Sequence, residues 1–180
     1  MLLVGMHSAQ GMRRAREYIP QMGRKSGEFA AHERFFLDEV IPHIDRRYSL
    51  RPGAAARIVF GYSNGADWAL TTGLRNPSVV NKVIALSASW PVPEDQLHRA
   101  ADAGLAVALG SGSLEGEFHE NTLNIARSFD RMSVCYQHQY AVAGHDMALW
   151  QQLLPTALMW CLRADDAGTW QLRRTMNGDP

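Results

Sequence analysis

The sequence predicts an α/β protein in which a mostly parallel β-sheet lies between layers of helices, and three observations support this class. Short apolar runs alternate with longer segments of helical spacing, the pattern of parallel strands joined by helical crossovers. Apolar residues make up 46% of the 180 residues and charged residues 20%, as in ordinary globular domains. No internal repeat or linker interrupts the pattern, so we expect one domain over residues 1–180.

The N-terminal half begins with a short apolar run, Met1–Met6, which predicts a buried strand. The polar, Arg-rich stretch 8–27 predicts a loop. Apolar residues at helical spacing predict a helix over Glu28–Arg47, and Pro42 should kink it. The next apolar run, Ala56–Phe60, predicts a second buried strand.

The C-terminal half continues the alternation, starting with a helix from Gly65 to about Leu74. The further expected strands are Lys82–Ser87, Leu105–Leu109 and Ser133–Tyr140, and the further expected helices are Glu120–Met132 and Asp146–Leu162, the last interrupted by Pro155. Residues 165–180 are polar, and we expect a loose tail there.

Charge and composition exclude several classes of partner. Eighteen basic residues balance eighteen acidic ones, whereas a nucleic-acid or anionic-membrane partner would favour a basic face. The N-terminus has no basic segment followed by a long apolar one, so we expect no signal peptide, no transmembrane span and a cytoplasmic location. Two cysteines, Cys135 and Cys161, are too few for a disulfide framework and are expected to be buried free thiols.

The strongest motif is Gly61-Tyr-Ser-Asn-Gly65, which follows an apolar strand and opens a helix. This context is typical of a nucleophile elbow, a turn so tight that side chains two residues to either side of Ser63 would collide. The backbone N–H of Asn64 would then donate to a developing oxyanion, with a second N–H supplied near His7, after the first strand. The alternative is a plain strand-to-helix turn with a serine that faces solvent.

A serine nucleophile needs a base and an acid that orients it. His145 follows the last strand and begins a helix, where the base belongs, although a helix cap is the alternative. The acid should follow the strand Leu105–Leu109. Glu115 is the first choice, Glu117 the second and Asp130 a poor third, unless these glutamates only face water at a helix start.

Four motifs resemble, in order and spacing, the putative-esterase family, which includes enterochelin esterases and esterase D-type S-formylglutathione hydrolases. They are Gly61-Tyr-Ser-Asn-Gly65, Leu86-Ser-Ala-Ser-Trp90, Gly112-Ser-Leu-Glu115 and Gly144-His-Asp-Met-Ala-Leu-Trp150. The resemblance is closest to the enterochelin esterase-like branch and covers nearly the whole chain. It implies an α/β-hydrolase fold and a Ser–His centre with an acid at Glu115, although some members of the siderophore branch work as a Ser–His dyad.

The same resemblance implies a feature of the N-terminus. Members of the family usually begin with two or more antiparallel strands before the one expected at Met1–Met6, and these are missing here. We therefore expect an N-terminally truncated chain whose bare sheet edge favours a homodimer.

Together these observations predict a serine esterase that cleaves small-molecule carboxylic esters through Ser63, His145 and Glu115, with no metal and no organic cofactor. The candidates for lining the substrate pocket are Trp68, Trp90, Arg14 and Arg16. Core packing is the alternative for the tryptophans, and surface solvation is the alternative for the arginines. Two other functions stay open: a thioesterase or S-formylglutathione hydrolase with the same centre, and a catalytically silent binding module.

Overall fold

The computed structural model describes residues 1–163, so the tail expected over residues 165–180 lies outside the described part of the chain. The chain divides into two compact units, Met1–Ser49 and a second that begins at Leu50. The expectation of a single domain over residues 1–180 stays a prediction.

The second unit contains a parallel sheet of four strands within residues 50–163, in the order β1-β2-β3-β4. The strands are β1 (Ile58–Tyr62), β2 (Lys82–Leu86), β3 (Ala106–Gly112) and β4 (Cys135–Ala141). Each pairs in parallel with the next along the chain. The predicted α/β class is confirmed, and all four strands lie within a few residues of their predicted bounds.

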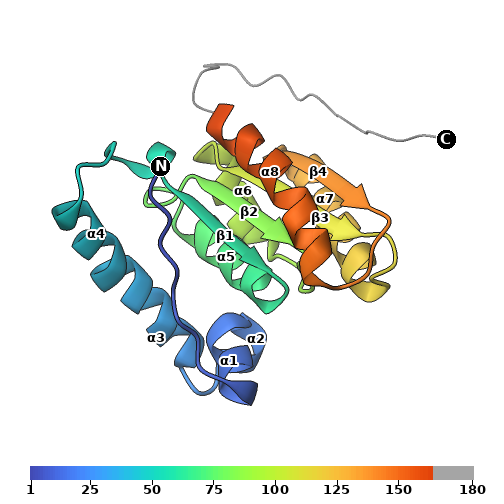
Figure 1. Cartoon of the computed structure of the whole chain (residues 1–180), viewed down its shortest axis with the longest axis horizontal. Helices are drawn as coiled ribbons and strands as arrows, with labels where there is room; N and C mark the ends of the chain where they lie inside the picture. Colours follow the sequence, from blue (N-terminus) through green and yellow to red (C-terminus); the bar gives the residue numbers. More distant parts are fainter. Residues whose placement is uncertain (164–180) are drawn as a thin grey trace. The chain divides into compact units, whose positions relative to one another are not determined.

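Helices cover both faces of this sheet. They are α5 (Asn64–Arg75), α6 (Glu94–Asp102), α7 (Glu117–Met132) and α8 (Met147–Arg163), and a short 3-10 turn, η2 (Ala54–Ala56), precedes β1. The helices α5, α6 and α7 form one layer and α8 covers the opposite face (Figure 1). The sequence-based expectations do not include α6, and α8 runs through Pro155 without a break.

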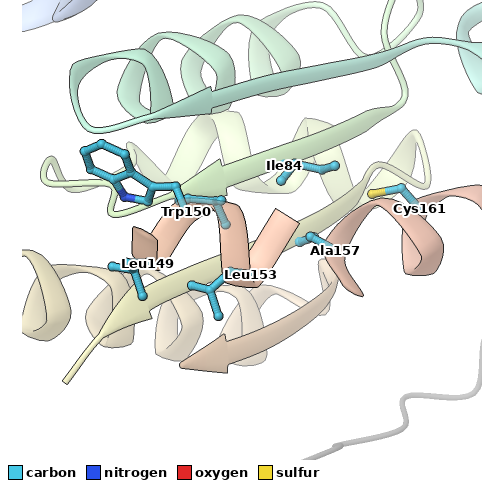
Figure 2. Packing of buried hydrophobic residues seen from close by; sticks show 8 residues of the cluster. Ile84, Leu149, Trp150, Leu153, Ala157 and Cys161 are labelled. Atoms are coloured by element: carbon cyan, nitrogen blue, oxygen red, sulfur yellow. The ribbon is translucent and has the colours of Figure 1, made fainter. Parts of the chain in front are cut away.

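Side chains of β2 alternate between the two helical layers. Val83 faces α5, where Gly73 leaves it room: a Cβ on that glycine would lie 2.3 Å from the valine side chain. Ile84 and Leu86 belong instead to the cluster beneath α8 (Figure 2). The α8 members of this cluster are Leu149, Trp150, Leu153, Ala157 and Cys161. Burial of each large apolar side chain contributes about 1.5–3 kcal/mol, and this packing fixes the start of α8 over the sheet.

Burial raises the pKa of both cysteine thiols. Cys161 is a fully buried residue of α8, and desolvation raises the pKa of its thiol to about 12. Cys135 is half-buried at the start of β4, and burial raises its pKa as well. Both thiols are free.

The first unit differs from its predicted elements in two places. Met1–Met6 is irregular rather than a buried strand, with Met1 94% and Leu3 85% exposed. An apolar run becomes a strand only when a neighbour takes up its backbone hydrogen bonds, and this run pairs with none of the four strands. The predicted loop 8–27 contains two short helices, α1 (Gly11–Tyr18) and α2 (Pro20–Gly23).

The predicted helix over Glu28–Arg47 is present, as three consecutive pieces. They are α3 (Glu28–Arg34), a π-helical turn η1 (Phe35–Val40) and α4 (Ile41–Arg47). In the π turn the Ile41 N–H donates to Phe36 O, a wider spacing than in an α-helix. Pro42 lacks an N–H and its ring crowds the preceding turn, so the widened turn takes the place of the expected kink. Within residues 1–163, none of the helices has the length and apolar character needed to cross a membrane.

Candidate active site

The carboxyl ends of all four strands meet at one edge of the sheet, and each continues into a segment with polar side chains. The parallel register pairs Tyr62 of β1 with Leu86 of β2, and Gly112 of β3 with Ala141 of β4. Ser63 therefore follows β1 at the edge where the segment after β4 delivers His145. Ligand and active sites of α/β sheets lie at this edge.

Ser63 has a strained backbone conformation, with φ 54° and ψ −133°. Such a conformation costs a non-glycine residue about 1–3 kcal/mol and persists only where its surroundings impose it. Here the Ser63 N–H donates to Leu86 O (3.0 Å) and the Ser63 carbonyl accepts from the Ala66 N–H (2.8 Å). These bonds tie the turn both to β2 and to the first turn of α5.

The two glycines of the motif have different roles. A Cβ on Gly61 would lie 1.9 Å from Gly65 O, so the expected collision is confirmed on that side. A Cβ on Gly65 would meet nothing within 4 Å, so the expectation is wrong there. The tight contact is therefore between Gly61 and the backbone of Gly65, and a side chain at position 65 would not take part in it.

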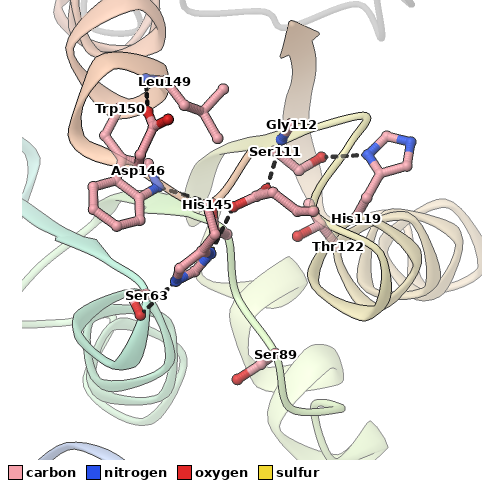
Figure 3. A network of polar contacts seen from close by, with 12 residues as sticks. Ser63, Ser89, Ser111, Gly112, His119, Thr122, His145, Asp146, Leu149 and Trp150 are labelled. Carbon is pink, nitrogen blue, oxygen red and sulfur yellow. Dashed lines mark hydrogen bonds and ion pairs between the residues drawn. The ribbon is translucent and has the colours of Figure 1, made fainter. Parts of the chain in front are cut away.

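Ser63, His145 and Glu115 form a chain of hydrogen bonds (Figure 3). His145 Nε2 lies 2.9 Å from Ser63 Oγ, and His145 Nδ1 lies 2.7 Å from Glu115 Oε1. An ionised carboxylate can only accept, so Nδ1 carries the proton in this pair. Nε2 is then the unprotonated nitrogen, and it accepts from the Ser63 hydroxyl. A histidine in this tautomer can take a proton from serine.

The Glu115 side chain is fully buried, whereas that of His145 is 29% exposed. The second carboxylate oxygen of Glu115, Oε2, accepts from the Gly112 N–H at 2.6 Å. The carboxylate is therefore fixed from both sides, by the end of β3 and by the imidazole. Glu117, the second choice, is the first residue of α7 and is exposed, as is Asp130 near the end of that helix.

The segment that carries Glu115 is joined to the segment that carries His145. The Ser113 N–H donates to Ala141 O (2.8 Å), and the Leu114 N–H donates to Ala143 O (3.1 Å). Gly112 permits this approach, because a Cβ there would lie 2.3 Å from Ala143 O. These bonds extend the pairing of β3 and β4 beyond the sheet.

Aromatic rings surround the imidazole, and none of these contacts is predicted from the sequence. The Phe118 ring stacks on His145 with centroids 4.0 Å apart and planes 27° apart. Trp150 stands perpendicular to the imidazole at 5.0 Å and stacks on Tyr62 at 4.4 Å. The Trp150 indole N–H donates to Ser87 Oγ (2.9 Å). Phe118 lies three residues after Glu115 and Trp150 five residues after His145, each in the helix that follows the site residue, so short separation from a predicted site residue is the only signal that the sequence carries for them.

A buried carboxylate that the sequence motifs do not indicate lies in the first turn of α5. Asp67 of α5 is 3% exposed. Its Oδ1 accepts from the N–H groups of Ser89 (2.9 Å) and Trp90 (3.0 Å), and its Oδ2 accepts from the Ser89 hydroxyl (2.7 Å). Burial raises the pKa of Asp67, and the three hydrogen bonds oppose that shift. Asp67 thereby ties the loop after β2 to the helix that begins at the nucleophile.

A second polar cluster joins β3, β4 and α7. Ser111 Oγ is 2.9 Å from His119 Nδ1 and 3.4 Å from His138 Nε2. The pKa of His138 is lowered to about 4, mainly by burial and to a smaller extent by the charge of the neighbouring His119. Among residues 1–163, no group of three or more His, Cys, Asp or Glu side chains is arranged to hold a metal ion.

The remaining predicted site residues lie in both units. Asn64 is the first residue of α5, where a helix leaves its N–H groups without intrahelical partners. Trp68 is buried, which agrees with core packing, and Trp90 is 37% exposed in the loop after β2. The others are in the first unit: Arg14 lies 6.0 Å from the Tyr18 ring centroid, Arg16 pairs with Glu28, and His7 is in the irregular segment before α1. Roles for His7 and the arginines stay predictions.

Comparisons with known proteins give a family and a set of solved structures with a similar fold. A sequence model of the family described as "Putative esterase" matches residues 4–161. A comparison with curated proteins found no match.

Solved structures with a similar fold include three esterases and hydrolases. An enterobactin esterase from Shigella flexneri has a TM-score of 0.65 and 19% identity, over 76% of this chain and 39% of that one. An S-formylglutathione hydrolase from Staphylococcus aureus has a TM-score of 0.62 and 18% identity, over 78% of this chain and 63% of that one. A ferulic acid esterase from Anaeromyces mucronatus has a TM-score of 0.63 and 15% identity, over 76% of this chain and 54% of that one. These likenesses show the α/β-hydrolase fold, and the chain spans between 38% and 63% of the length of eight such structures.

Proposed function

This chain belongs to the "Putative esterase" family, and from that premise we propose that it is a serine hydrolase of small-molecule carboxylic esters. One observation carries the proposal: the hydrogen bonds between His145 and Glu115 and between Ser63 and His145 join residues that are 30 and 82 positions apart in the sequence. A strained nucleophile turn at the carboxyl edge of the sheet supports it independently.

In the first half of the reaction, Ser63 Oγ attacks the ester carbonyl carbon while His145 Nε2 takes the hydroxyl proton. The C–O bond to the alcohol then breaks, and the imidazolium returns that proton to the departing alcohol. Glu115 keeps the Nδ1–H tautomer in place and stabilises the imidazolium. The product of this half is an acyl group on Ser63.

The negative charge on the carbonyl oxygen needs donors that are already in place. The Asn64 N–H at the start of α5 is the first donor, and the dipole of that helix acts in the same direction. We propose a backbone N–H at His7 as the second donor. Loss of one such donor typically costs about 3–4 kcal/mol of barrier.

In the second half, water replaces the alcohol. His145 Nε2 takes a proton from the water as its oxygen attacks the acyl carbon, and the same proton then returns to Ser63 Oγ when the ester bond breaks. The acid is released and the resting state is restored. No step calls on a metal or an organic cofactor.

The identity of the ester depends on the groups around Ser63. Trp90 is the stronger of the two tryptophan candidates for an acyl contact, because it is partly exposed and tied to the nucleophile helix through Asp67. Trp68 is the weaker one, since it is almost fully buried. Arg14 and Arg16 are proposed to attract an anionic ester, although both side chains already have partners on the first unit.

A thioester substrate is the second candidate, favoured by the likeness to an S-formylglutathione hydrolase. The same centre serves both substrates, because only the leaving group changes. Rates on p-nitrophenyl acetate and on S-formylglutathione, measured side by side, distinguish them. A thioester preference of tenfold or more in kcat/KM would favour this candidate over the oxyester.

The test of the main proposal is release of p-nitrophenol from short-chain p-nitrophenyl esters by the parent protein and by Ser63→Ala. Ser128→Ala is the matched control, because that serine is partly exposed on α7 and its hydroxyl forms hydrogen bonds with Asn124 and Arg131 of its own helix. We expect activity and fluorophosphonate labelling in the parent and in the control, and neither in Ser63→Ala. A folded parent that neither turns over an ester nor takes the label would overturn the proposal and favour a silent binding module.

Two further expectations, on oligomeric state and on cellular location, complete the proposal. We propose a homodimer that forms through a free sheet edge; β1 pairs on one side only within the described sheet. Sedimentation at several concentrations tests it, with a single monomeric species as the contrary result. We also propose a cytoplasmic location, which cell fractionation tests.

A further inference from the structure

We propose that Phe118 is a positioning residue for the general base, because its ring lies on the face of the His145 imidazole and fixes the plane of that ring. The inference rests on the proposed function, in which His145 exchanges protons with Ser63. Phe118 belongs to neither the motifs nor the hydrogen-bonded chain of the site.

The imidazole is restrained in its own plane by two hydrogen bonds, from Nδ1 to Glu115 and between Nε2 and Ser63. Its side chain is partly exposed and is carried by a loop between β4 and α8, so the core does not enclose it. Bonds in the plane leave the ring free to tilt out of that plane. The stacked Phe118 ring, at 4.0 Å and 27°, opposes this tilt.

Trp150 restrains the imidazole from a second direction. It stands at 89° to the ring with centroids 5.0 Å apart. Trp150 is itself fixed by the hydrogen bond to Ser87 and by its stack on Tyr62, the residue before the nucleophile. The imidazole thus contacts one aromatic ring from the acid segment and one that rests on the nucleophile strand.

The position of Phe118 follows from a single turn of the chain. Gly116 has φ 61° and ψ −120°, a region that side chains other than glycine rarely enter. This turn separates Glu115 from the start of α7, and Phe118 is the second residue of that helix. One short segment therefore supplies both the carboxylate that bonds the imidazole edge and the ring that covers its face.

The face contact has a further consequence for the reaction. The imidazole becomes an imidazolium when it takes the Ser63 proton, and an aromatic face attracts a cation. The contact is therefore stronger in the transition state than in the resting state, which places its effect on kcat rather than on KM. From the usual strength of an aromatic pair, loss of the ring should lower kcat by about 2- to 12-fold.

The experiment compares Phe118→Leu, which keeps an apolar side chain but loses the flat face, with Phe118→Tyr, which keeps the face. Phe129→Leu on the same helix is the matched control, because that ring is buried against Tyr136 and away from the imidazole. Steady-state kinetics on p-nitrophenyl acetate give kcat and KM, and thermal unfolding gives Tm. NMR spectra of the imidazole Cε1–H, assigned with His145→Gln, report the stacked geometry without any turnover.

We expect Phe118→Leu to lose kcat with an unchanged KM, Phe118→Tyr to restore it, and Phe129→Leu to lower Tm while kcat is retained. The His145 Cε1–H signal should lie upfield in the parent and move downfield in Phe118→Leu. An unchanged kcat in Phe118→Leu, a change in KM alone, or an equal loss in Phe118→Tyr would each overturn the proposal. If the parent shows no Ser63-dependent turnover, the proposed function fails, and the NMR shift alone then decides whether the ring contact exists.

Discussion

Replacement of Glu115 by glutamine tests the proposed reaction most sharply, because the substitution keeps the shape of the side chain and changes only its hydrogen bonds. Glu115 accepts from two donors, the Gly112 N–H at 2.6 Å and His145 Nδ1 at 2.7 Å. A glutamine side chain has one carbonyl oxygen and one NH2 group, so it can satisfy only one of them as an acceptor. The Gly112 N–H is a backbone donor with a fixed direction, so the glutamine oxygen should accept from it.

The NH2 group of the new side chain then faces His145 Nδ1. To accept from it, the imidazole must move its proton to Nε2, and Nε2 can no longer take the proton of Ser63. A wrong tautomer of this kind typically lowers kcat by about 10⁴-fold, or about 5 kcal/mol. We expect a loss of 10³- to 10⁴-fold in Glu115→Gln, with the fold intact by circular dichroism.

Glu117→Gln is the matched control, because this exposed glutamate lies two residues away at the start of α7. Initial rates on p-nitrophenyl acetate, normalised to fluorophosphonate-titrated sites of the parent preparation, compare the two variants. Full activity in Glu117→Gln is expected. A loss below tenfold in Glu115→Gln would refute the reasoning and indicate a centre that works as a Ser–His dyad.

The other predictions concern stability. Gly61→Ala should lose about 3 kcal/mol or more of unfolding free energy, because its Cβ meets the backbone of residue 65 at 1.9 Å, whereas Gly65→Ala should stay within about 1 kcal/mol of the parent; equal urea midpoints for the pair would contradict this. The pKa of His138 is lowered to about 4 from 6.5, so the unfolded chain binds the extra proton first and stability falls as the pH drops from 6.5 towards 4, by up to about 1.4 kcal/mol per pH unit. Urea unfolding at pH 7 and pH 5 should show that His138→Gln flattens this slope. The pKa of Asp67 is raised above 3.8, so ionisation of the buried carboxyl costs stability as the pH rises through that window, and Asp67→Asn should gain stability at pH 7 but not at pH 3; a loss at pH 7 would mean that the charge itself is needed.

A site is most predictable from sequence where one short segment carries its own physical signal. The Gly-x-Ser-x-Gly string between a strand and a helix specifies a local turn, and Ser63 has the strained conformation that such a turn requires. His145 was indicated by its position after the last strand, because parallel topology brings that segment to the same edge. Spacing alone does not distinguish Glu115 from Glu117, since the choice depends on the turn at Gly116.

The failures have a common cause, which is that they depend on partners distant in the sequence. Met1–Met6 has the composition of a strand, but composition does not supply the neighbour that a strand pairs with. The contacts of Phe118 and Trp150 arise from packing between α7, α8 and the loop at His145. Asp67 resembles any acidic residue in the first turn of a helix, and only its burial distinguishes it.

The hydrogen bonds that join the segments after β3 and β4 also determine which parts of the site move together. Because Ser113 and Leu114 bond Ala141 and Ala143, the acid and the base share one backbone ladder and should fluctuate as a single body. Ser63 belongs to a different ladder, between β1 and β2. Thermal motion should therefore vary the distance from histidine to serine while the distance from histidine to glutamate stays constant. The amides of Ser113 and Leu114 should accordingly exchange with solvent as slowly as those of the sheet itself.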